Sequence, residues 1–343
     1  MDTLNRPLIS IIIPVYNVEK YLRPSLDSII VQDISDCEIL LINDGSKDNS
    51  LSILQEYMEL YPNIRVINKD NEGVSATRNR GLDECLGEYF YFMDSDDRLH
   101  PQLLSLIRKE IYSFQPDIIV WDFNTFYSKP KYIKVPTSLS AENVPNNNKE
   151  GFNYLMMKGS AVSLWNKAIR RSLIGKKVRI DTTMSYGEDM FFCWKAIMLA
   201  EKIRYIHLPL YYYIQTGNGA TNRFHNDLYE HYRKAFEDMY HFVKKQGMAS
   251  ESVLSSIDYH FACRIPSLSN METRAPYGRE RKISHLNTVL KDDYIQRGLF
   301  GTPQPTGLIF TYARNNNVAA MLRYARWESL KLKLVFPIKK ILK

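Results

Sequence analysis

The sequence has few cysteines, no export signal and no long apolar run. Its 343 residues include four cysteines, which lie far apart and form no C-x-x-C pair. A zinc site of that kind and a compact disulfide framework are therefore not expected. The N-terminus lacks the basic and apolar stretches of a signal peptide, and no apolar segment approaches the roughly 20 residues that cross a bilayer. We expect a reducing, cytoplasmic setting and no membrane span.

Two phosphate-binding motifs are also missing. No G-x-G-x-x-G follows the first apolar run, and no G-x-x-x-x-G-K-[ST] occurs anywhere in the chain. Each of these glycine-rich loops binds phosphates through its backbone N–H groups. If the protein binds a nucleotide, the phosphates of that nucleotide need a binding partner other than a glycine-rich loop. A divalent metal is the obvious candidate.

The composition is that of an ordinary folded protein, but its positive charge is unevenly distributed along the chain. Hydrophobic residues make up 45% of the chain and charged residues 24%, and no segment has the low complexity of a linker. The stretch 314–343 holds eight Lys or Arg and one acid, and this excess of positive charge equals the net charge of +7 of the whole chain. With its large apolar side chains, it could contact an anionic membrane, or form a solvated and partly docked helix.

Short apolar runs alternate with segments of helical composition, which is the pattern of βαβ units. A further helix is expected near 103–112, a strand at DIIVWDF and a surface loop at 137–150. From residue 226 long helical patterns replace the strands. The sequence therefore predicts an α/β domain with a mostly parallel sheet over 1–225 and a helical region over 226–343. The four runs are LISIIIP, CEILLIND, IRVIN and EYFYFMD.

Polar side chains follow three of these four runs. In an open α/β sheet, ligands bind outside the carboxyl ends of the strands. The sequence therefore predicts one pocket at this rim of the sheet. The residues are Tyr16 and Asn17, with Pro14 before them, at the end of the first run, Asp44 at the end of the second, and Asp94, Asp96 and Asp97 at the end of the fourth.

The three aspartates after the fourth strand predict a metal site. Three like charges within four residues repel one another unless solvent, protons or cations relieve them. Carboxylate oxygens suit Mn²⁺ or Mg²⁺, which commonly complete their coordination with substrate phosphates. A capped helix start is the simpler alternative. Asp44 could accept the imide N–H of a uracil or thymine, or merely form a turn with Gly45.

Four motifs together resemble family 2 glycosyltransferases, whose GT-A-type fold is a Rossmann-like, mostly parallel sheet flanked by helices. They are IIIPVYNVEKYL, LLINDGSKDNS, NEGVSATRNRG and FMDSDD, within about 8–98. Three later stretches, LWNKAIRRSLI, GEDMFF and PLYYYIQTGNGAT, are similar to the acceptor half of bacterial members that build surface polysaccharides. The resemblance implies a nucleotide-sugar half over about 1–98 and an acceptor half over about 99–225, and no motif is recognised beyond.

The resemblance implies inverting transfer of a sugar from a nucleoside diphosphate donor to a glycan hydroxyl. Tyr16 and Asp44 are expected to contact the base, and Arg78 to lie near the nucleotide. Asp94 and Asp96 fall on the D-x-D positions and are the candidate metal ligands, with Asp94 also near ribose and sugar. We expect a hexose or N-acetylhexosamine carried on UDP, although dTDP presents the same base edge. The expected acceptor is a lipid-linked glycan or lipopolysaccharide intermediate.

Asp189 in the GEDM stretch falls on the position of the general base. Inversion in one displacement needs a base for the acceptor hydroxyl proton and an electrophile for the leaving diphosphate. Glu188 is a second candidate. Alternatively, both acids merely favour the N-terminus of the following helix. Trp165 could lie against the apolar face of a sugar or belong to the core.

Two other classes of protein stay open. A nucleotidyltransferase also combines an α/β sheet with acidic metal ligands, but it normally carries a glycine-rich basic loop that PVYNVEKYL lacks. A non-catalytic glycan-binding or membrane-assembly protein would not need to keep Asp44, Asp94, Asp96 and Asp189 intact. We therefore expect a metal-dependent transferase without a nucleic-acid partner, located in the cytoplasm or at the inner face of the cell membrane.

Overall fold

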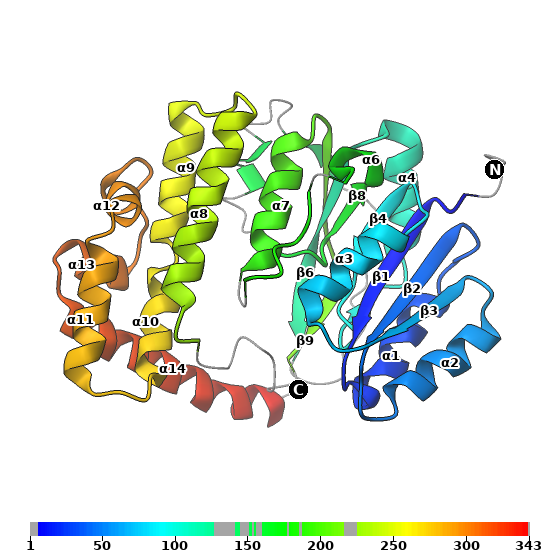
Figure 1. Ribbon diagram of the computed structural model, residues 1–343, viewed down its shortest axis with the longest axis horizontal. Coiled ribbons are helices and arrows are strands. Elements are labelled where there is room, and N and C mark those ends of the chain that lie inside the picture. Colours follow the sequence, from blue (N-terminus) through cyan, green and yellow to red (C-terminus); the bar gives the residue numbers. More distant parts are fainter. Residues whose placement is uncertain are drawn as a thin grey trace. The chain divides into compact units, whose positions relative to one another are not determined.

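The computed structural model divides the chain into two compact units (Figure 1). The first comprises Met1–Met184 and Glu188–Thr216, and the second Ser185–Gly187 and Gly217–Lys343. The structure describes residues 6–126, 141–144, 151–152, 154–155, 160–176, 178–184, 187–215 and 225–341. For residues 332–341 it describes only the helical backbone. Most of the polar stretch 137–150 and the TGNGAT sequence lie outside the described residues.

The first unit is built on a mixed sheet that has nine strands within the described ranges. The strand order is β3-β2-β1-β4-β8-β6-β9-β5, and β7 pairs with β9. β1 runs parallel to β2 and β4, and β2 runs parallel to β3. The bounds are β1 Ile9–Val15, β2 Cys37–Asp44, β3 Ile64–Lys69, β4 Tyr89–Phe92, β5 Arg98–Leu99, β6 Ile118–Phe126, β7 Ala141–Asn143, β8 Lys167–Arg170 and β9 Ile203–Ile214.

The strands predicted from the four apolar runs are β1 to β4. Every residue of β1, β2 and β4 is buried, because helices cover both faces of this part of the sheet. Burial on two faces explains why these strands read as continuous apolar runs rather than as alternating ones. The α/β fold class and its mostly parallel core are confirmed.

Three helices cover one face of the sheet. They are α1 (Glu19–Ile30), α2 (Ser50–Leu60) and α4 (Leu103–Phe114), and α4 confirms the helix predicted near 103–112. Leu26 of α1 and Leu54 of α2 belong to one apolar cluster with the inward-facing side chains of the strands. Burial of each large apolar side chain in this cluster stabilises the folded state by about 1.5–3 kcal/mol.

Two other helices, α3 (Val74–Glu84) and α7 (Glu188–Leu199), pack on the opposite face. α3 lies very close to the sheet, because a Cβ atom on Gly81 would stand 2.3 Å from Cγ2 of Ile12. α7 inserts Phe192, whose ring centroid lies 6.4 and 6.2 Å from those of Phe90 and Phe92. A short helix, α6 (Arg171–Ile174), follows β8.

The strand order brings the predicted rim together. β1 lies between β2 and β4, so the segments that follow these three parallel strands leave the sheet side by side. Pro14 is buried near the end of β1. Pairing of β1 with β4 stops at Ile12. The absence of an N–H group at Pro14 therefore costs no hydrogen bond to β4.

The second unit is helical in its described part, which confirms the helical C-terminal region. α10 packs against α14 and α11, and α9 packs against α8 and α12. The helices are α8 Leu228–Lys245, α9 Glu251–Ala262, α10 Ile265–Arg274, α11 Arg279–Leu290, α12 Asp293–Phe300, α13 Leu308–Arg314 and α14 Val318–Ile341.

The basic segment is mostly the helix α14. Its first turns are docked, since Val318, Met321 and Ala325 are buried, whereas Trp327 and Leu330 are about half exposed. The side chains from residue 332 onward lie outside the described residues, so the membrane contact stays a prediction.

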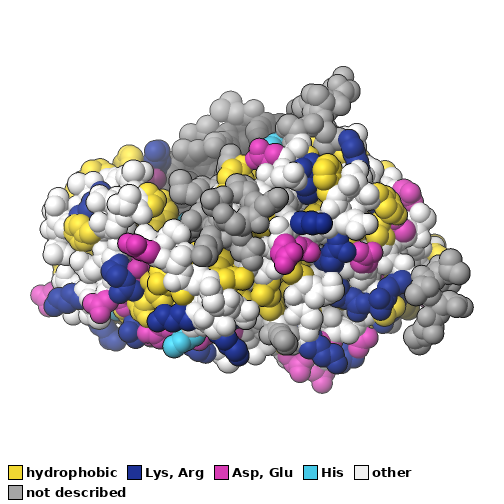
Figure 2. All heavy atoms as spheres, turned by 90° about the horizontal axis from the view of Figure 1, so that it is seen from above, with side chains coloured by type: hydrophobic (Ala, Val, Ile, Leu, Met, Phe, Trp, Pro, Cys, Tyr) yellow, Lys and Arg dark blue, Asp and Glu magenta, His cyan; other side chains and the backbone are white. Residues whose placement is uncertain are grey.

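On the face drawn in Figure 2, basic and acidic side chains are interspersed. Within the described ranges, no helix combines the length and apolar character needed to span a bilayer.

Candidate active site

The segments after β1 and β2 are hydrogen-bonded to each other. The backbone N–H of Asn17 donates to Oγ of Ser46 at 3.1 Å, and the N–H of Lys47 donates to Oδ1 of Asn17 at 2.7 Å. Asn17 has a φ of 51°, a left-handed conformation that asparagine tolerates better than most residues. This fixed turn presents Tyr16 with 50% of its surface exposed, so its ring is available to a ligand.

The carboxylate of Asp44 is buried and fully occupied by donors. The backbone N–H groups of Glu72 and Gly73 each donate to it at 2.9 Å, the Asn71 amide donates at 3.3 Å, and the Lys69 ammonium donates to Oδ1. Burial alone would raise the pKa of Asp44, but Lys69 and the Glu72 amide outweigh it and hold the pKa below its usual range. A base imide could bind only by displacing one of these donors, and the base contact stays a prediction.

The acidic segment after β4 is tied to β9 by a tyrosine. The Tyr211 hydroxyl donates to Oδ2 of Asp97 at 2.7 Å and accepts from the backbone N–H of Asp94 at 3.2 Å. The N–H of Ile214 donates to the other oxygen of Asp97 at 2.6 Å. Burial, with the nearby charges of Asp94 and Asp96, still raises the pKa of Asp97 well above its usual range. Asp97 therefore fixes the backbone of the segment, and Asp94 and Asp96 lie next to it.

Asp96 is the member of the cluster best suited to a metal. Its side chain is partly buried, and burial, together with the charge of Asp94, raises its pKa to about 6. A bound divalent cation would relieve both effects. The described residues hold no ready-made group of three or more acidic, His or Cys ligands. The site thus fits an ion held by one or two carboxylates with phosphate oxygens completing its shell.

Arg78 of α3 connects this segment to the start of α7. Its guanidinium lies 3.0 Å from Oδ1 of Asp94 through Nη2 and 3.4 Å from Oε1 of Glu188 through Nη1. Only 8% of Arg78 is exposed. Burial would lower its pKa, but the charges of Asp94, Glu188 and Asp189 raise it above its usual value. One buried cation therefore neutralises acids from two segments that are far apart in sequence.

Asp189 and Glu188 lie side by side in sequence but in different environments. Glu188 is paired with Arg78. Asp189 is partly buried and accepts a hydrogen bond from its neighbour's backbone, the N–H of Met190, at 2.8 Å. Burial and the charge of Glu188 raise the pKa of Asp189 to about 6, against the opposing effect of Arg78. A carboxylate that titrates near neutral pH can accept a proton at physiological pH.

Trp165 belongs to an aromatic stack on β9. Its ring centroid lies 4.6 Å from that of Tyr211 and 5.8 Å from that of Tyr213, with near-parallel planes at 12° and 15°. Phe123 meets it edge-on at 4.6 Å. Trp165 thereby packs on the tyrosine that holds Asp97. The predicted sugar contact would use what remains of its partly buried surface, and it stays a prediction.

A buried lysine lies beneath the start of α7. Lys167 is 1% exposed, and its ammonium donates to the backbone O of Ser163 at 2.6 Å and to Oδ1 of Asn166 at 2.5 Å. Burial lowers its pKa, while Cys193 and Asp189 favour its charged form. The sequence motifs predict no role for this lysine or for Tyr211, although both lie in the LWNKAIRRSLI and PLYYYIQTGNGAT stretches.

Part of the chain matches a known protein family. Residues 10–176 match the model of the family described as glycosyl transferase family 2. The chain is 34% identical over 229 residues to the glycosyltransferase GlyA of Streptococcus pneumoniae, covering 65% of this chain and 32% of GlyA. It thus spans about a third of the length of that relative. It is 28% identical over 301 residues to the uncharacterized glycosyltransferase EpsJ of Bacillus subtilis, covering 87% of each.

A solved structure shares the fold over almost the whole chain. Residues 1–349 of S. aureus TarS, in complex with UDP-GlcNAc, match with a TM-score of 0.67 and 22% identity, covering 94% of this chain and 91% of that one. At this identity the likeness shows the fold alone. It agrees with the GT-A-type fold expected from the motifs.

We expect Tyr211→Phe to weaken metal binding as well as stability. The change leaves the buried Asp97 without one donor, which costs about 1–3 kcal/mol of unfolding free energy. Because the acidic segment then loses its link to β9, the affinity for Mn²⁺ in the presence of UDP should fall roughly 10- to 100-fold. Calorimetry measures both effects.

The matched control is Tyr57→Phe, which removes a hydroxyl that donates to Asp27 at 2.5 Å between α1 and α2. It should lose less stability, because Asp27 is exposed and can hydrogen-bond to water instead, and it should keep its Mn²⁺ affinity. Equal Mn²⁺ affinities for the two variants would show that Tyr211 has no role in positioning the acidic segment.

Proposed function

Residues 10–176 belong to glycosyltransferase family 2, and on this basis we propose that the chain transfers a hexose or N-acetylhexosamine from a UDP-linked donor to a glycan hydroxyl. The transfer inverts the anomeric centre. The observation that carries the proposal is Asp189, a carboxylate with a pKa of about 6 beside a buried arginine that also pairs with the acidic segment after β4.

The donor binds at the rim formed by the segments after β1, β2 and β4. Tyr16 offers an exposed ring to the base, and Asn17 next to it is hydrogen-bonded to Ser46 and Lys47, which follow Asp44. Asp96, with Asp94, holds the divalent metal. When bound, that metal neutralises the negative charge of the departing diphosphate. Arg78 offsets the charge of Asp94, so that the donor's phosphates do not face an uncompensated carboxylate.

The chemical step is a single displacement. Asp189 takes the proton of the acceptor hydroxyl, whose oxygen forms a bond to the anomeric carbon. The bond between that carbon and the phosphate oxygen breaks on the opposite face, and the nucleoside diphosphate leaves with both electrons. Glu188 stays paired with Arg78 and positions the start of α7.

Two observations support the choice of UDP and of a polymeric acceptor. TarS, whose fold matches, holds UDP-GlcNAc in its solved structure. The acceptor-half stretches resemble enzymes that build surface polysaccharides, so the proposed acceptor is a glycan of a surface polysaccharide or lipopolysaccharide. The basic segment 314–343 would then bring the enzyme to the anionic membrane that carries a lipid-linked acceptor.

We expect Asp189→Asn to abolish most transfer and to leave donor affinity unchanged. A general base contributes roughly 10²- to 10⁴-fold to the chemical step, and the amide cannot accept the proton. Release of UDP in the presence of acceptor measures turnover, and calorimetry with UDP-GlcNAc measures binding. Glu188→Gln, the control, should lose less. The reverse order of the two variants would make Glu188 the base.

The pH dependence should report the influence of Arg78 on Asp189. The base must be deprotonated, so kcat/KM should rise with pH through about 6, the raised pKa of Asp189. Because Arg78 lowers that pKa, Arg78→Gln should move this acid limb to higher pH. Arg80→Gln, on the exposed side of the same helix, should leave it in place. An acid limb that does not move in Arg78→Gln would contradict the assignment.

Removal of the metal should stop turnover. Since a metal contributes several kcal/mol to stabilising the leaving group, turnover in excess EDTA should fall by roughly 100-fold or more and return with added Mn²⁺. Asp96→Ala should require far more Mn²⁺ for the same rate. Full activity after dialysis against EDTA would rule out the metal, and an unchanged Mn²⁺ requirement in Asp96→Ala would place the ligand elsewhere.

A further inference from the structure

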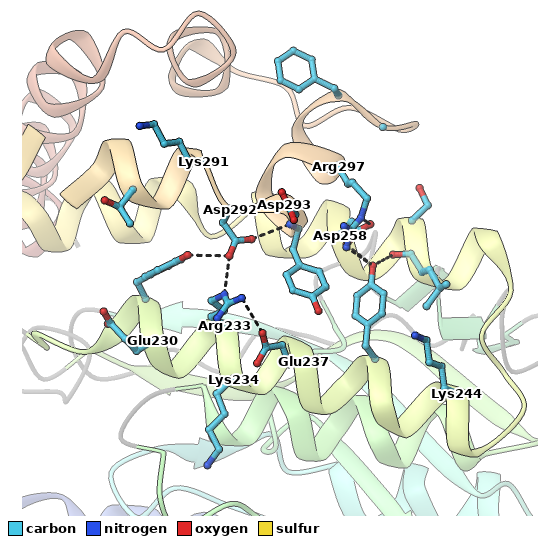
Figure 3. Close-up of a pocket in the computed structure, with 18 of the residues that line it drawn as sticks. Glu230, Arg233, Lys234, Glu237, Lys244, Asp258, Lys291, Asp292, Asp293 and Arg297 are labelled. Carbon is cyan, nitrogen blue, oxygen red and sulfur yellow. Dashed lines mark hydrogen bonds and ion pairs between the residues drawn. The ribbon is translucent and has the colours of Figure 1, made fainter. Parts of the chain in front are cut away.

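The helical unit contains a large groove that the proposed reaction does not use. It has a volume of about 1480 Å³ and is lined by α8, α9, the end of α11, α12 and the segment between α11 and α12 (Figure 3). Pockets for small ligands usually measure about 300–1,000 Å³. The groove is therefore large enough for several linked units, such as a short stretch of a polymer.

The ionisable side chains of the groove nearly balance in charge, with five cations and six acids. A polyanion would need an excess of cations, so the balance favours a neutral ligand. The cations are Arg233, Lys234, Lys244, Lys291 and Arg297. The acids are Glu230, Glu237, Glu251, Asp258, Asp292 and Asp293.

Both arginines are fixed by acids within the groove (Figure 3). Arg233 lies 3.0 Å from Asp292 and 3.1 Å from Glu237, and Arg297 donates to the two oxygens of Asp258 at 2.8 and 3.1 Å. Each arginine side chain is still 49% exposed. The pair of Arg297 with Asp258 is neutral, and Arg233 with its two acids carries one negative charge. Both groups offer oriented N–H donors and carboxylate acceptors, which suit the hydroxyl groups of sugars.

Aromatic rings lie beside these polar groups. Tyr240 and Tyr294 have ring centroids 5.0 Å apart, and the guanidinium of Arg297 lies 4.7 Å from the centroid of Tyr294. Phe300, another lining residue, is 52% exposed. A sugar has an apolar C–H face and a polar rim of hydroxyl groups. An exposed aromatic ring next to fixed hydrogen-bonding groups is complementary to both.

We propose that this groove binds a neutral oligosaccharide, namely the sugars of the acceptor glycan that do not react. The identity of the ligand as acceptor rests on the proposed function. Binding itself does not, because the groove residues take no part in the transfer. The groove gives the helical unit a function in acceptor choice that no recognised motif indicates.

Calorimetry with the full chain and neutral oligosaccharides tests the proposal. The probes are chitohexaose, cellohexaose, maltohexaose and mannohexaose, with linear polyphosphate as the anionic comparison. At least one neutral probe should bind, and Phe300→Ala should weaken that binding by roughly tenfold, which corresponds to about 1.4 kcal/mol. Arg233→Lys, which keeps the charge but loses the planar fork, should weaken it too.

The matched control is Trp327→Ala, which removes a ring that is 54% exposed on α14 and does not line the groove. It should bind the oligosaccharide like the parent chain. The proposal is overturned if no neutral probe binds, if polyphosphate binds more tightly, or if Phe300→Ala and Arg233→Lys both bind like the parent.

Affinity for UDP-GlcNAc, measured on the same variants, separates this proposal from the proposed reaction. Phe300→Ala and Arg233→Lys should keep the parent's donor affinity. A chain that binds oligosaccharide through Phe300 but releases no UDP would support the groove and contradict the transfer. A chain that releases UDP but binds none of the neutral probes would contradict the groove alone.

Discussion

The proposed active site depends on one buried cation, the guanidinium of Arg78. It contacts Asp94, which follows β4, and Glu188, which begins α7, and it lowers the pKa of Asp189. A buried charge is tolerated only when it is paired, and removing one partner of such a pair costs about 3–5 kcal/mol. The acids after β4 and the acids that begin α7 are therefore held together electrostatically, and movement of either set would leave the buried Arg78 with fewer partners.

The close packing of α3 makes this contact possible. Gly81 allows the helix to approach Ile12 of β1, and Arg78 lies almost one turn earlier on the same helix. From the other side, Tyr211 and the backbone of Ile214 hold Asp97, and Trp165 packs on Tyr211. The acidic segment is thus fixed by an ion pair to α3 and by hydrogen bonds to β9, which leaves Asp96 as the carboxylate best able to accept a metal.

Much of the first unit could be predicted because its signals are local. β1, β2 and β4 are apolar throughout since both faces of the sheet are covered, and the polar residues after them meet at one rim because the strands are parallel neighbours. The partners of the site residues could not be predicted, because they lie far away in sequence. Arg78 and Glu188 are 110 positions apart, and Asp97 and Tyr211 are 114 apart. The groove of the helical unit is formed by charged residues whose pairing leaves no periodic or motif signal.

The proposed mechanism requires that the environment of Asp189 makes it a base near neutral pH. Carbon-13 NMR of the chain labelled at aspartate carboxyl groups measures this directly, with the resonance of Asp189 identified by its loss in Asp189→Asn. We expect a titration midpoint near pH 6, the value to which burial and Glu188 raise this pKa. A midpoint at about 3.9, the ordinary value for aspartate, would contradict it.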